Sequence, residues 1–192
     1  MPEIRKGNRL RTNASRRANA LGWHLLIYRM PAEPASKRVS VWRDLHRLGA
    51  LYLQQCVCIL PTMEGPNAEL SRITSKIPAL GGDFTLIDLP LVPPEDEARF
   101  VSSFRTQRAS EYAELVVACE TTFSKRVEFE ALQRTMSAGA IEELRRQLHD
   151  LERRFEWISQ HDWFDADKRE DAERSLMHCA RLLAELEERT RG

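Results

Sequence analysis

The residues of this chain best suited to bind an anion are concentrated near its N-terminus. Residues 1–60 hold eleven Lys or Arg against three Asp or Glu, whereas residues 61–192 hold eighteen against twenty-six, so the neutral total conceals halves of about +8 and −8. Arginine can bind a phosphate through two parallel hydrogen bonds, and each neutralised phosphate releases counterions. The residues predicted to bind nucleic acid are Arg16, Arg17, Arg29, Lys37, Arg38, Arg43 and Arg47. The alternative for the central group is an ordinary solvated helix face.

The first twenty residues form a segment of their own. They combine six Lys or Arg with Gly, Asn, Ser and Thr and very few apolar side chains. Such a segment cannot bury itself, so residues 1–20 are predicted to be a basic disordered tail that a partner orders. An organelle transit peptide has a similar composition, but a tail beside a polyanion site explains it equally well and is the interpretation adopted.

Two cysteines, Cys56 and Cys58, are spaced for thiol chemistry. On one strand they would project from the same side, close enough to share an oxidation event and too far apart for an easy disulfide. Free cysteine is also among the most buried residue types, so a structural role is the alternative. The four cysteines show no paired CxxC spacing, which favours a reducing compartment and predicts neither a structural metal site nor a cofactor.

The densest cluster of other potential ligands is His161, Asp162, Asp165 and Asp167. A metal or acid-base site there is conceivable, but Asp is favoured at turns and helix caps, and the cluster lies between two predicted helices. A Gly-rich phosphate loop, a Ser-His-Asp order and a paired carboxylate motif are not evident, so no catalytic residue is predicted.

The elements that must position these groups follow from periodicity. Strands are predicted at residues 23–30, 51–60 and 84–89, and helices at 36–48 and 67–80. In the first helix the expected buried stripe is Val39, Trp42, Leu45 and Leu48; in the second it is Leu70, Ile73 and Ile77. This order is the pattern of a split β-α-β, ferredoxin-like sheet.

After Pro93 and Pro94 only helical periodicity remains. Helices are predicted at residues 95–132, with a break near Ala109, then at 138–160 and 168–189, the last two as an antiparallel hairpin. The predicted organisation is therefore a tail at 1–20, an α+β ferredoxin-like domain at 21–92 and a helical extension at 93–192. No apolar run is long enough to span a bilayer, so we expect a cytoplasmic protein without a membrane partner.

Several motifs resemble the N-terminal domain of ChrB-type chromate-resistance regulators. They are WHLLIYRMP (23–31), VWRDLHRLG (41–49), QCVCILP (55–61), GGDF (81–84), EYAEL (111–115), RRFEWI (153–158) and DWF (162–164). The resemblance spans residues 21–189. It implies a bacterial regulator of a chromate-efflux operon that binds operator DNA and releases it when chromate, its effector, appears. Larger members carry a second, C-terminal chromate-resistance domain.

The first strand also resembles, more distantly, the ferredoxin-like nuclease subunit of CRISPR spacer integration and the central domain of phenylacetate-pathway repressors. In that nuclease family the strand ends in Tyr-Asp, and the carboxylate is the proposed metal ligand. Here the pair is Tyr28 and Arg29. A guanidinium has no lone pair for a hard cation but binds oxyanions, so the departure favours a binder over a nuclease.

The predicted function is a chromate-responsive, DNA-binding transcriptional regulator that forms a homodimer through sheet edges or the helical hairpin. One alternative is an enzyme, either a residual metal-dependent nuclease or a thiol-assisted chromate-detoxification protein that uses Cys56 and Cys58. Another is a scaffold that binds a protein through its acidic helices.

Overall fold

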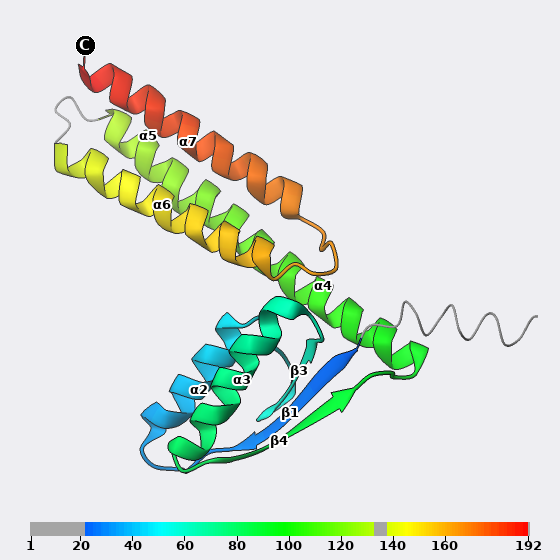
Figure 1. Ribbon diagram of the computed structural model, residues 1–192. Coiled ribbons are helices and arrows are strands. Elements are labelled where there is room, and N and C mark those ends of the chain that lie inside the picture. Colours follow the sequence, from blue (N-terminus) through cyan, green and yellow to red (C-terminus); the bar gives the residue numbers. More distant parts are fainter. Residues whose placement is uncertain (1–21, 133–137, 192) are drawn as a thin grey trace, which may run out of the picture. The chain divides into compact units, whose positions relative to one another are not determined.

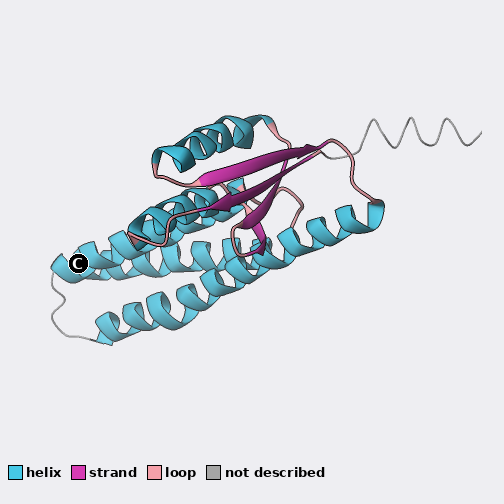
Figure 2. Ribbon diagram, turned by 90° about the horizontal axis from the view of Figure 1, so that it is seen from below, coloured by secondary structure: helices cyan, strands magenta, loops and turns pink. Residues whose placement is uncertain are grey.

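The computed structural model describes residues 22–132 and 138–191, which divide into two units (Figure 1). The first contains the described residues up to Ala98, and the second begins at Arg99. Strands occur in the first unit, whereas the described part of the second consists of helices and the loop at residues 161–168 (Figure 2). The mixed α+β class predicted from periodicity is confirmed.

The first unit is a four-stranded antiparallel sheet with two helices. Its order is β2-β3-β1-β4, which with one helix after β1 and another after β3 is the ferredoxin-like arrangement. The elements are β1 (Trp23–Arg29), α2 (Ala35–Arg47), β2 (Leu51–Gln54), β3 (Val57–Pro61), α3 (Glu64–Ala79) and β4 (Asp83–Leu89). Because β1 is central, its nearly continuous apolar run fits a strand paired on both sides.

Alternation along β1 divides its side chains between the two faces of the sheet. His24 bonds Asn67 of α3 through Nε2 and Oδ1 at 2.9 Å, so His24, Leu26 and Tyr28 lie on the helix side. Arg29 therefore leaves the sheet on the opposite face. On α3, the predicted stripe is buried as expected, at Leu70, Ile73 and Ile77.

The predicted strand at residues 51–60 is wrong, because the chain folds there into a hairpin. Strands β2 and β3 pair antiparallel, with Leu51 opposite Ile59 and an irregularity between Tyr52 and Gln54. Cys56 occupies the turn with a φ of 62°, in the left-handed region that few residues other than glycine adopt. Since no Gly or Asn marks this turn, composition alone offered no signal for it.

The buried stripe of α2 also differs from the prediction. Leu45 and Leu48 are buried as expected, together with Val41, but Val39 and Trp42 are 40% and 48% exposed. Residues 41, 45 and 48 follow the i, i+4, i+7 spacing of one helix face, whereas 39 and 42 lie beside it. Two large apolar side chains thus remain near the cationic residues of the helix.

The second unit contains α4 (Pro94–Val117, which begins in the first unit), the π-helix η1 (Ala118–Ser124), α5 (Lys125–Leu132), α6 (Ala138–Gln160) and α7 (Arg169–Arg191). The predicted break near Ala109 is wrong, since α4 runs through it. Alanine has the highest helix propensity and no Gly or Pro interrupts the segment. The irregularity lies further on, where α4 passes into η1.

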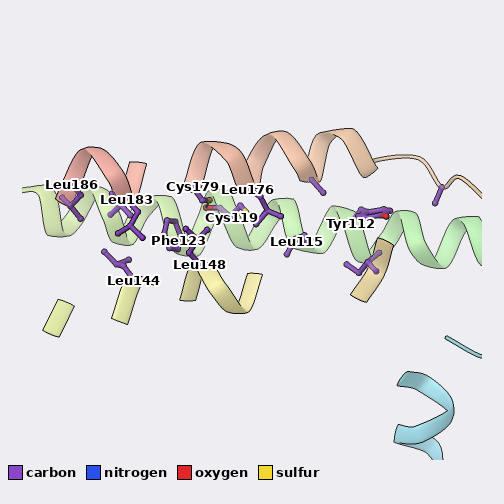
Figure 3. Packing of buried hydrophobic residues seen from close by; sticks show 14 residues of the cluster. Tyr112, Leu115, Cys119, Phe123, Leu144, Leu148, Leu176, Cys179, Leu183 and Leu186 are labelled. Carbon is purple, nitrogen blue, oxygen red and sulfur yellow. Dashed lines mark hydrogen bonds between the residues drawn. The ribbon is translucent and has the colours of Figure 1, made fainter. Parts of the chain in front are cut away.

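Helices α6 and α7 form the predicted antiparallel hairpin, packed beside the continuous α4–η1–α5 segment (Figure 1). The core between them is apolar from end to end (Figure 3). Its labelled members are Tyr112, Leu115, Cys119, Phe123, Leu144, Leu148, Leu176, Cys179, Leu183 and Leu186. Burial of these residues stabilises the helices of this unit, which contain many charged residues on their other faces.

Candidate functional site

Three cations of α2 have no acidic partner in the described part of the chain. The side chains of Lys37, Arg38 and Arg43 form no ion pair or hydrogen bond there, and both arginines are exposed. In the helical unit, by contrast, Arg126, Arg145, Arg146, Arg153, Arg154 and Arg174 each lie beside a carboxylate. Unneutralised guanidinium groups keep their full hydrogen-bonding capacity for an external anion.

The acidic residue on α2 does not offset these cations, because a lysine of the neighbouring helix binds it. Lys76 of α3 donates to Asp44 Oδ2 at 2.6 Å and to Ser40 Oγ at 2.8 Å. The pair is half-buried and joins α2 to α3. The contact therefore fixes α2 against α3. It also leaves the positive charges of Lys37, Arg38 and Arg43 without a neutralising carboxylate on their own helix.

The other residues predicted to bind nucleic acid do not all lie on this helix surface. Arg29 is exposed, and no described carboxylate pairs with it, although it lies opposite Asp83 in the strand register. It belongs to the sheet face away from α2, so the structure does not place it on the same surface as Arg38 and Arg43. Arg47 is exposed at the end of α2 and has a partner of its own. Arg16, Arg17 and the predicted tail lie outside the described residues.

A cavity of about 400 Å³ adjoins the cationic helix. It lies between α2, the end of β1 and the β2–β3 hairpin. Trp42 stacks on His46 with ring centroids 5.3 Å apart, and the phenol oxygens of Tyr28 and Tyr52 lie 3.1 Å apart. Burial raises the pKa of Tyr28 to about 12 and raises that of Tyr52 further, so both phenols are neutral at ordinary pH. The sequence did not indicate this cavity, because Trp42, which lines it, was predicted to be buried in the core.

The two cysteines predicted as a redox pair are not on one strand. Cys56 lies in the hairpin turn, whereas Cys58 lies in β3 and is fully buried. Burial, with a smaller contribution from Cys56, raises the pKa of Cys58 to about 12. A thiol with that pKa is protonated at neutral pH and is a poor nucleophile. The geometry assumed for their joint oxidation is therefore wrong.

A comparison with known protein families finds a match over most of the chain. Residues 38–191 match the family model described as "Protein ChrB, N-terminal". The chain belongs to the ChrB N-terminal family. A "Protein ChrB" from Cupriavidus metallidurans is 27% identical over 114 residues, which cover 58% of this chain and 35% of that protein. The chain thus spans about a third of the curated relative. No solved structure shows significant similarity to it.

The ChrB match runs from α2 through α7 and so includes the helical unit. There, Asp162 accepts hydrogen bonds from the Ala166 amide at 2.8 Å and the Tyr112 hydroxyl at 3.2 Å. The His161 ring contacts the carbonyl of Trp157 at 2.6 Å. Asp162 and His161 thus hold the loop between α6 and α7, as predicted for turn and cap residues. Across residues 22–132 and 138–191, no three His, Cys, Asp or Glu side chains converge as metal ligands.

One ion pair in the helical unit of this ChrB-family chain is largely buried. The guanidinium of Arg108 is 1% exposed, lies 3.1 Å from Glu111 Oε1 and faces the Trp157 ring at 5.1 Å. Burial lowers the pKa of Arg108 and raises that of Glu111.

In the part of the chain that the structure describes, each helix is too short or too polar to cross a bilayer.

Proposed function

We propose that this ChrB-family chain is a chromate-responsive transcriptional regulator that binds operator DNA through α2 and the basic tail. One observation carries the DNA-binding part: Lys37, Arg38 and Arg43 lack carboxylate partners, while the acid of their own helix is bound by Lys76. A polyanion would supply the missing partners. The chromate part rests on membership of the family.

The proposed contacts of α2 would position the protein on the DNA backbone, without recognising a particular base sequence. Lysine and arginine side chains on a helix contact phosphate oxygens, which are the same at every base pair. Base selection would then fall to another element, and the tail with Arg16 and Arg17 is suited to a minor groove, where basic arms bind.

The test is a salt-series titration of labelled operator-region DNA by fluorescence anisotropy. We expect Lys37→Ala, Arg38→Ala and Arg43→Ala together to weaken binding at low salt. The negative slope of log K against log salt should become shallower by about 2 to 3, since each lost phosphate contact reduces its magnitude by about 0.9. Deleting residues 1–20 should lower it further.

A matched control removes three cations that already have carboxylate partners. Arg72, Arg146 and Arg153 are 58%, 67% and 67% exposed and pair with acids three residues away. Changing all three to Ala alters the net charge equally, but should leave the slope nearly unchanged. Equal losses for the two triple variants would refute the interface, because the effect would then be one of net charge alone.

The effector proposal needs a separate comparison. Operator affinity should fall when chromate is added at fixed ionic strength and should not fall with sulfate, which has the same shape and charge. An equal loss with both anions would refute a specific response and leave the DNA-binding proposal intact.

We also propose that the regulator is a homodimer. Strand β4 is an edge of the sheet, and its Leu86 and Ile87 are 37% and 38% exposed. Exposed apolar edges favour pairing with another strand. A monomer at micromolar concentration in sedimentation equilibrium would contradict this, and Leu86→Lys should weaken a dimer that uses this edge.

A further inference from the structure

Two cysteines distant in sequence meet in the core of the helical unit. Cys119 belongs to η1 and Cys179 to α7, sixty residues later, and Figure 3 shows them side by side. The Cys179 thiol lies 3.8 Å from the Cys119 carbonyl oxygen, and the two thiols are within hydrogen-bonding reach of each other. Neither is more than 1% exposed. The sequence offered no sign of this pair, since the two positions share no motif.

The π-helix makes this place unusual. A π-helical stretch inserts extra backbone into an α-helix, and such stretches occur often at functional sites. Here the Ser124 hydroxyl donates to the Cys119 carbonyl at 2.9 Å, and the same hydroxyl lies beside Cys179. The irregular backbone therefore brings a hydroxyl and two thiols together in otherwise apolar surroundings.

A cavity of about 580 Å³ reaches these groups. Its lining includes Cys119 and Ser124 from η1 and Ser175 and His178 from α7. Lys168 and Arg174 also line it, and each contacts Asp171. A small polar molecule can thus approach one thiol of the pair, although neither sulfur is open to bulk solvent.

We propose that Cys119 and Cys179 are an oxidisable dithiol that closes to an intramolecular disulfide when a peroxide enters this cavity. The two S–H bonds and the O–O bond of the peroxide break, and one S–S bond forms. The two thiols lose two electrons and two protons, which convert hydrogen peroxide into two molecules of water. The product joins η1 to α7 covalently.

The electrostatics of the pair agree with this chemistry. The hydrogen bond to Cys179 and burial raise the pKa of Cys119, whereas the hydrogen bond from Cys119 lowers the pKa of Cys179. Cys119 is the thiol that lines the cavity, so it is the one that a peroxide oxidises, to a sulfenic acid with release of one water. Cys179 is the more acidic thiol, and its thiolate then attacks the Cys119 sulfur and displaces hydroxide, which forms the disulfide.

The test treats the full chain with hydrogen peroxide, alkylates the remaining thiols and maps peptides by mass spectrometry. We expect a peptide pair joined through Cys119 and Cys179, lost again on treatment with dithiothreitol. The matched control, Cys56→Ser with Cys58→Ser, should form the same bond at the same peroxide concentration. Cys119→Ser should abolish the bond and leave Cys179 alkylated or as a sulfenic acid.

Two results would overturn the proposal. One is complete alkylation of both Cys119 and Cys179 after a peroxide dose that oxidises Cys56. The other is a disulfide that joins two chains instead of one. The wild-type peptide map decides between these outcomes even if a serine variant fails to fold. Because the readout is mass, failure here is distinct from failure of the DNA-binding proposal.

Discussion

The buried pair of Arg108 and Glu111 offers the sharpest test of how the helical unit is stabilised. The guanidinium is almost fully enclosed, and its nitrogens form no aligned hydrogen bond with a described residue. Its compensation is the Glu111 carboxylate at 3.1 Å and the face of Trp157 at 5.1 Å. Glu111→Gln keeps the shape of the side chain and removes the negative charge.

The expected cost follows from what remains around Arg108. Breaking a buried ion pair by removing one partner costs about 3 to 5 kcal/mol, because the other charge stays buried. Glu111 is 17% exposed and the Trp157 ring still faces the cation, so we expect the lower end, about 3 kcal/mol. Arg108→Met with Glu111→Gln removes both charges and should cost about 1 kcal/mol or less.

The assay is urea unfolding of the full chain followed by circular dichroism, with tryptophan fluorescence as a second probe. A double-mutant cycle should return a coupling energy of about 2 kcal/mol or more. The control is Asp150→Asn, which breaks an exposed pair with Arg153 at the same spacing of three residues and should cost less than about 0.5 kcal/mol. A loss below about 1 kcal/mol for Glu111→Gln would refute the reasoning, since the guanidinium would then be solvated.

Three further predictions concern stability. Because the pKa values of Cys58 and Tyr28 rise from 9.0 and 10.0 to about 12, the unfolded state loses these protons first. The free energy of unfolding should therefore fall between pH 9 and 12, by up to about 1.4 kcal/mol per pH unit and group, and Cys58→Ala should reduce the slope. Gly82→Ala should destabilise by about 1 to 3 kcal/mol in urea unfolding, because a Cβ there would lie 2.6 Å from a backbone oxygen and 2.9 Å from Ile77. Phe123→Ala in η1 should cost about 3 to 5 kcal/mol, measured in the same way.

Each of these predictions has an opposing result. If the free energy of unfolding depends on pH in Cys58→Ala as it does in the wild type, the pKa of the Cys58 thiol is not raised by folding. If Gly82→Ala is as stable as the wild type, the backbone before β4 can move away from these contacts at no cost. For Phe123, the control is Phe129→Ala, a 57% exposed ring in α5 that should change stability by less than about 0.5 kcal/mol.

Much of the fold could be predicted from local pattern. The stripe Leu70, Ile73 and Ile77 located the buried face of α3, and the composition change after Pro94 located the helical region. Periodicity works there because one amphipathic element buries one face whatever its partner. It failed for residues 51–60, where two short strands of one hairpin give the same apolar run as one long strand.

For the candidate sites, the sequence alone determined that cationic residues are concentrated in and around α2, because composition and spacing are local properties. Only the tertiary structure decided which charges have partners: Asp44 is bound by Lys76 of another helix, and Arg29 lies on the other face of the sheet. It also brought together Cys119 and Cys179, a pair that no spacing rule predicts. The physical reason is the same in each case. Periodicity defines the faces of an element, whereas the contacts of a face depend on how distant segments pack against it.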